Sequence, residues 1–176
     1  VFKARDKLTA TQSKVKTFCF TAVELHAVYR TNEVDIHDIA VRNITSATHG
    51  CSLVRFLNCD GAKEYNITVE NITDTGNAIS GCGVIIGVGN DGFAPIRPHT
   101  MGEFSNITIR NLKTCAQEGL QLCEPCRDVL VENVTVYGGG LIGMTCSANF
   151  VADNMTVRNF AFLHLDFSLT IVYYVC

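Results

Sequence analysis

The chain has 176 residues, of which 47% are hydrophobic and 18% are charged, and its formal net charge is −3. This length supports one domain with its own core, and the composition is that of a globular chain and not of a disordered one. The net negative charge and the lack of a basic cluster argue against a nucleic-acid partner. The apolar run at 160–176 is short for a bilayer and is interrupted by His164 and Asp166, so we expect no membrane partner either.

One strand-like motif is repeated five times along the chain. Each copy alternates apolar and polar residues, as a half-buried strand does, and each carries an Asn at the same place near its end. The steps between successive copies of this Asn are 28, 40, 22 and 26 residues. Such repeats predict an all-β fold, a right-handed parallel β-helix (a solenoid) of about five coils. The copies lie at 38–44, 66–72, 105–112, 128–134 and 154–160.

The β-helix is expected to occupy 34–176, with 1–33 as an irregular N-terminal segment or a partial coil. The chain begins with Val1, and no capping segment is recognisable at either end. Because a solenoid needs its exposed edges covered, we expect this chain to be a fragment of a longer solenoid.

The recurring Asn has the same parity as the apolar residues, which predicts that its side chain faces inward. Inward Asn side chains would form an internal ladder, with amides bonded up and down the stack at ~4.8 Å spacing. The predicted ladder consists of Asn43, Asn71, Asn111, Asn133 and Asn159.

The residue before each of these Asn residues alternates in sign from coil to coil, which predicts ion pairs on the outer face. The side chains expected to be exposed are Arg42, Glu70, Arg110, Glu132 and Arg158. The apolar positions of the same motifs predict burial of Ile107, Ile109, Val129, Val131, Met155 and Val157.

Six Asn-x-Thr sequons arise from the repeat itself, at Asn43, Asn66, Asn71, Asn106, Asn133 and Asn154. An inward position would put three of them out of reach of a glycosyltransferase. Only Asn66, Asn106 and Asn154 are then expected to be able to carry a glycan.

Nine cysteines are present, and Cys123 and Cys126 have the spacing of a metal or redox motif. A zinc site would need a second such pair, and a thioredoxin-like motif would need a βαβ context, neither of which the sequence offers. We interpret these cysteines as buried thiols that act as small apolar residues, and we expect neither a metal nor a cofactor.

The longest departure from the repeat is the segment 87–103, which lies within the 40-residue step. Insertions in solenoids leave the stack as loops, often on the binding face. We expect substrate contacts from Asp91, Arg97 and His99.

The strand Asn-Ile-Thr-Ile-Arg-Asn, followed by a polar turn, a Gly and a second apolar strand, resembles the right-handed parallel β-helix enzymes that act on pectin. Among these the polygalacturonase-like glycoside hydrolases look closest, over about 34–160. That family is an inverting one, which needs separated carboxylates. Its Asp-Asp motif is replaced here by Gln117-Glu118, its Gly-His-Gly motif by Gly138-Gly139-Gly140, and its Asn-Thr-Asp and Arg-Ile-Lys motifs have no match.

The resemblance implies Glu118 as the catalytic general acid, without its usual partner carboxylate, acting on an acidic or plant-type polysaccharide outside the cell or at its surface. His49, Arg55, Gln117 and Gln121 are the expected substrate-binding residues around it. Two alternatives stay open. One is a non-catalytic β-helix that binds glycans or spaces domains, as in adhesins and spike proteins. The other is a polysaccharide lyase in which Arg55 is the base.

Overall fold

The computed structural model describes residues 9–11, 14–18, 23–27, 35–49, 52–58, 62–75, 81–87, 102–138, 142–146 and 152–164. Every element in these ranges is a β-strand, and the strands form two sheets in which all pairings are parallel. The described residues include no helix long and apolar enough to cross a membrane. The all-β class expected from the repeats is confirmed.

Long strands make up most of the first sheet, and short strands make up the second. In the first, the order is β1-β4-β6-β8-β10-β12, with β2 also pairing with β4. Its strands are β1 (Thr9–Thr11), β2 (Lys14–Phe18), β4 (Ile36–His49), β6 (Lys63–Asp74), β8 (Glu103–Thr114), β10 (Cys126–Gly138) and β12 (Ala152–His164). The second sheet has the order β11-β9-β7-β5-β3, and its strands are β3 (Val23–Ala27), β5 (Val54–Asn58), β7 (Cys82–Ile86), β9 (Glu118–Leu122) and β11 (Ile142–Cys146).

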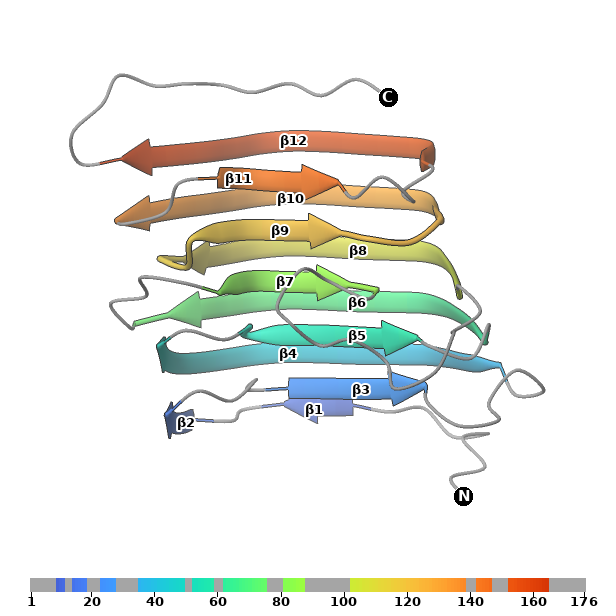
Figure 1. Ribbon diagram of the computed structural model, residues 1–176, viewed down its shortest axis with the longest axis horizontal. Helices are drawn as coiled ribbons and strands as arrows, with labels where there is room; N and C mark the ends of the chain where they lie inside the picture. Colours follow the sequence, from blue (N-terminus) through green and yellow to red (C-terminus); the bar gives the residue numbers. More distant parts are fainter. Residues whose placement is uncertain are drawn as a thin grey trace.

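From β3 onward, successive strands belong alternately to the two sheets. Figure 1 shows the long strands stacked in one layer and the short strands stacked in another, running in the opposite direction. Each long strand pairs with the next long strand in the sequence, without a skipped copy of the repeat. This order is compatible with a parallel β-helix, because each repeat adds one strand to each layer.

The core lies between the two sheets and is formed by inward side chains of both. Ile107, Ile109, Val129 and Val131 are buried, as predicted from the apolar positions of the repeat. Burial of each such side chain stabilises the fold by roughly 1.5–3 kcal/mol.

The prediction of burial was wrong for two residues of β12. Met155 is only half-buried, and Val157 is 41% exposed. The reason is position, since β12 is the last strand of its sheet in the part of the chain that the structure describes.

The Asn ladder exists in the predicted register, but it lies outside and not inside. All five Asn side chains are exposed, and each of the last four donates a hydrogen bond from Nδ2 to Oδ1 of the Asn in the preceding coil. The Nδ2–Oδ1 distances are 3.0 Å for Asn71 to Asn43, 2.9 Å for Asn111 to Asn71, 3.1 Å for Asn133 to Asn111 and 3.0 Å for Asn159 to Asn133. The internal ladder is therefore corrected to an external one.

The backbone conformation at each Asn explains why the alternation of apolar and polar residues wrongly predicted an inward side chain. Asn111 has φ of 54°, in the left-handed region, and the alternation of the strand breaks there. Ile109 is buried, Arg110 and Asn111 are both exposed, and Leu112 is buried again. An αL residue thus inserts one extra outward position, and Asn tolerates this conformation better than most residues do.

A second ladder of the same kind runs five residues upstream of the first. The alternation of apolar and polar residues did not predict it either. Asp38, Asn66, Asn106, Asp128 and Asn154 are all exposed and have φ between 50° and 57°. The Nδ2–Oδ1 distances are 3.0 Å for Asn66 to Asp38, 2.8 Å for Asn106 to Asn66 and 2.7 Å for Asn154 to Asp128.

Exposure also corrects the expectation for the sequons. All six sequon Asn side chains are exposed, including Asn43, Asn71 and Asn133, which were expected to be inaccessible. Each of them is instead engaged in ladder hydrogen bonds.

The predicted charge alternation produces ion pairs between neighbouring coils. Glu70 lies between Arg42 and Arg110 and contacts both, with 2.8 Å between Arg42 Nε and Glu70 Oε1. The Nε–H of Arg42 makes no hydrogen bond, so that contact is electrostatic only. The Glu70 side chain is 13% exposed, less than predicted, because both guanidinium groups cover it. Partly exposed pairs of this kind contribute ~0–1 kcal/mol each.

The external ladder predicts a specific order of stability at position 111. Asn111→Leu should lower the free energy of unfolding by about 2–4 kcal/mol, because it loses two ladder hydrogen bonds and forces a branched side chain into αL. Asn111→Gly loses the same bonds without the strain and should lose about 1–2 kcal/mol less. Urea unfolding curves of both variants measure this. Equal losses would mean that αL strain has no part in the effect.

Asp128 marks a gap in the second ladder that a substitution should close. A carboxylate has no N–H to donate to Asn106, and the structure has no hydrogen bond between the two side chains. Asp128→Asn should add one bond and stabilise the chain by ~0.5–1.5 kcal/mol. Asp38→Asn is the matched control, since no described ladder residue precedes Asp38 to accept a bond. Thermal melts in which Asp38→Asn gains as much as Asp128→Asn would contradict this.

Candidate functional site

The sequence-predicted catalytic residue lies at the start of a short strand. Glu118 is the first residue of β9 and is half-buried, and its backbone N–H donates to the carbonyl of Gly81 at 3.0 Å. Gln121 Nε2 donates to Glu118 Oε2 at 3.3 Å. Gln117, in the turn before β9, is also half-buried. The structure therefore brings Glu118 and Gln121 into contact.

Arg55 and Gln121 share one cross-strand row of the short-strand sheet. Arg55 is in register with Ile85 of β7, and Ile85 is in register with Gln121 of β9. The neighbours of Arg55 and of Gln121 along their strands are core residues, so both side chains point away from the core. They are nonetheless only 6% and 3% exposed, so this row is not an open surface.

Of the remaining predicted substrate-binding residues, the structure describes only the backbone position of His49. His49 is the last residue of β4 and pairs with Phe18, so it belongs to the long-strand sheet, whereas Glu118 and Arg55 belong to the other. Asp91, Arg97 and His99 lie outside the described residues.

The Cys-x-x-Cys segment has the buried character expected of it. Cys123 and Cys126 are both free thiols with almost no exposed surface. Across the described ranges there is no group of three or more His, Cys, Asp or Glu side chains that could hold a metal ion.

Three buried carboxyl groups in the described residues were missed by the sequence interpretation. Glu64 and Asp74 of β6 are 0% exposed, and Glu124, in the turn between β9 and β10, is 1% exposed. Burial, assisted by the nearby Glu124, raises the pKa of Glu64 to about 8.

A signal for Glu64 was present in the sequence. Counted from the second ladder, Glu64 stands two residues before Asn66, a place that is apolar in the other four repeats. Those other residues are Ile36, Phe104, Cys126 and Ala152. When one repeat has an acidic residue at an inward position that is apolar in all the other repeats, its carboxyl group is expected to be buried.

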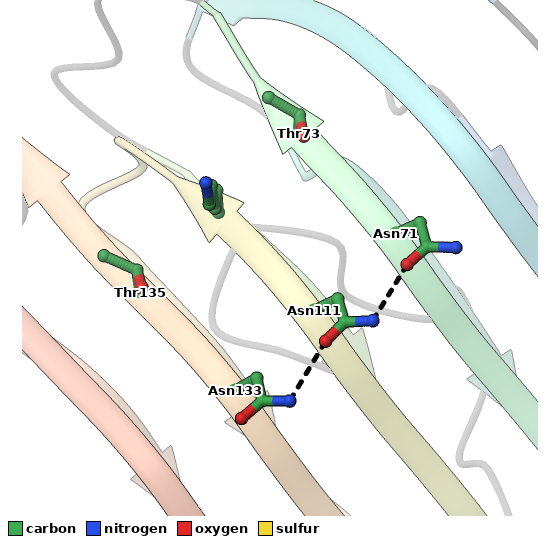
Figure 2. Close-up of a pocket in the computed structure, with 6 residues that line it drawn as sticks. Asn71, Thr73, Asn111, Asn133 and Thr135 are labelled. Atoms are coloured by element: carbon green, nitrogen blue, oxygen red, sulfur yellow. Dashed lines mark hydrogen bonds between the residues drawn. The ribbon is translucent and has the colours of Figure 1, made fainter.

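The outer face of the long-strand sheet carries an open polar trough of about 410 Å³ (Figure 2). One side is the first Asn ladder, and the other is a row in which Thr73, Lys113 and Thr135 are in register on β6, β8 and β10. Its lining residues, called the Asn–Thr trough here, are Asn71, Thr73, Asn111, Lys113, Asn133 and Thr135.

The Asn–Thr trough repeats its chemistry from coil to coil. Amide and hydroxyl groups recur at the ~4.8 Å strand spacing, and Lys113 adds one positive charge in the middle. Such an array can hydrogen-bond a ligand that is itself repetitive and polar. The sequence analysis missed this surface because it predicted that the Asn side chains face inward.

Comparison of the chain with protein-family models, with curated proteins and with solved structures finds no match.

Proposed function

We propose that this chain is a right-handed parallel β-helix of about five coils that binds an acidic polysaccharide along the Asn–Thr trough. The observation that carries the proposal is the trough itself, in which hydrogen-bonding groups repeat across three successive coils. A polymer of sugar units laid across the coils meets the same amides and hydroxyls at each step. Lys113 favours sugars that bear carboxylates, because it is the charged group in the row.

The proposal agrees with the resemblance to pectin-acting β-helix proteins in its ligand class, and it implies an extracellular or cell-surface location. If the protein is a non-catalytic binding or spacer module, the Asn–Thr trough alone is sufficient for its function. This non-catalytic form is the one that the geometry supports best, because the short-strand row of Arg55 and Gln121 offers little exposed surface to a polymer.

Binding should depend on Lys113 and not on lysine content in general. Lys113→Gln should weaken binding of oligogalacturonates about tenfold, the loss of one charge-assisted contact. Lys63→Gln is the matched control, because Lys63 is an exposed lysine of the same sheet outside the trough. Titration calorimetry at low and moderate salt measures both. An equal effect of the two variants, or no binding by the wild type, would remove the proposal.

Hydrolysis at Glu118 is a second candidate, favoured by the hydrogen bond from Gln121 that orients the carboxyl group. In this role Glu118 donates a proton to the leaving glycosidic oxygen. The expected result is release of reducing ends from polygalacturonate by the wild type and its loss in Glu118→Gln. Unsaturated products alongside the reducing ends would indicate a lyase instead, and activity that survives in Glu118→Gln would exclude this residue.

A further inference from the structure

An aromatic side chain, Tyr137, lies directly beyond the row of Thr and Lys residues in the Asn–Thr trough. It stands two residues after Thr135 on β10, with the buried Val136 between them. The alternation of the strand holds over these three residues, because the last left-handed residue before Tyr137 is Asn133. The side chains of Thr135 and Tyr137 therefore leave β10 on the same, outer side.

The Tyr137 side chain is tied to a strand two coils away from its own. Its hydroxyl donates a hydrogen bond to the backbone carbonyl of Asp74, the last residue of β6 and 63 positions away in the sequence. Because β8 lies between β6 and β10 in the sheet, the side chain crosses the end of β8 to reach this carbonyl. These are the same three strands that carry the Asn–Thr trough, so Tyr137 borders the trough across all three of its coils.

Packing holds the ring from below. Tyr137 packs against Cys115 and Ala116, which directly follow β8 and are 4% and 1% exposed. These two residues are themselves fixed. Cys115 Sγ donates to Asp74 Oδ2 at 3.4 Å, and the backbone N–H of Ala116 donates to Thr114 Oγ1 at 3.0 Å.

The protonation of Tyr137 favours the same fixed position. Burial raises the pKa of its hydroxyl, and the neighbouring Cys115 and Asp74 raise it further. The hydroxyl therefore stays protonated at neutral pH and remains able to donate its hydrogen bond.

A ring that is fixed in this way and only half-buried has the properties of a stacking platform. A pyranose ring presents hydroxyl groups at its edge and C–H groups on its faces. The edge suits the amides and hydroxyls of the Asn–Thr trough, and a C–H face packs well on an aromatic ring. Because the Tyr137 ring is already ordered before a ligand arrives, stacking on it costs little side-chain entropy.

We propose that Tyr137 is a sugar-stacking residue of the Asn–Thr trough, on which one pyranose ring of the bound polymer rests. This inference rests on the proposed polysaccharide binding and narrows its ligand class. Charge alone would let Lys113 accept any polyanion. A stacking ring selects a polymer of uronic acid rings over an acyclic polycarboxylate.

The absorbance of tyrosine reports the stacking contact. The chain has 5 Tyr residues and no Trp, so its near-ultraviolet spectrum comes mainly from tyrosine. Titration of oligogalacturonate into the whole chain should produce a tyrosine difference band that saturates together with the heat of binding measured by calorimetry. Tyr137→Phe keeps the ring, so it should bind within about threefold of the wild type and lose the difference band.

Tyr137→Leu removes the ring but keeps an apolar side chain against Cys115 and Ala116. It should weaken oligogalacturonate binding about tenfold. Tyr65→Leu is the matched control, because Tyr65 is a half-buried tyrosine of the same sheet outside the trough. Its ring is stacked on His37, with 5.0 Å between the ring centroids. Tyr65→Leu should leave both the affinity and the difference band unchanged.

Poly-L-glutamate tests the ligand class. It carries carboxylates along a chain without sugar rings, so it should give no tyrosine difference band with the wild type. A band as large as that produced by oligogalacturonate would overturn the stacking role.

The outcomes separate the stacking role from the function on which it rests. A wild type that does not bind oligogalacturonate overturns both. If Lys113→Gln weakens binding and Tyr137→Leu does not, the trough binds the polymer and only the stacking role is overturned. Equal losses of affinity in Tyr137→Phe and Tyr137→Leu would show that the hydroxyl matters and the ring does not, which also overturns it.

The test does not depend on how well Tyr137→Leu folds. Tyr137→Phe loses only the hydroxyl and keeps the packing against Cys115 and Ala116. A wild-type band that disappears in Tyr137→Phe, while binding persists, supports the stacking role. The absence of a band in the saturated wild type, or its survival in Tyr137→Phe, overturns it.

Discussion

The structure depends on one backbone constraint, the left-handed conformation of two residues in each long strand. Without it, a strand of 12 to 14 residues such as β6 or β4 would run straight and alternate strictly. With it, the long strand is divided into three parts, and each part turns its own apolar side chains to the core. Asn and Asp occupy all ten positions, because their short polar side chains tolerate αL. Except between Asn106 and Asp128, each also bonds to the corresponding residue one coil away.

This constraint also decides how much the sequence could predict. Local alternation of apolar and polar residues was enough to predict the repeat and its register. It also predicted the burial of Ile107 and Ile109, which the structure confirms. The outward orientation of Asn111 could not be predicted in the same way. Strict alternation of inward and outward residues does not show where one extra outward residue is inserted. The constant spacing of five between the two Asn/Asp positions was the available evidence that both are special.

The candidate site shows a similar division. The contact between Gln121 and Glu118 was predictable, since both residues belong to one short strand. The placement of His49 in the long-strand sheet was not, because it depends on how far β4 runs before the chain turns. Glu64 and Glu124 are 60 positions apart in the sequence, yet Glu124 is one cause of the raised pKa of Glu64. No local sequence pattern predicts this interaction.

The Asn ladder has a direction. In every one of its hydrogen bonds the donor belongs to the later coil and the acceptor to the earlier one. The two ends of the row therefore differ chemically. Among the described residues, Asn43 only accepts a ladder bond and Asn159 only donates one. Because the coils of a solenoid contact only their neighbours, a further coil before Asn43 would have to offer an acceptor, and one after Asn159 would have to offer a donor.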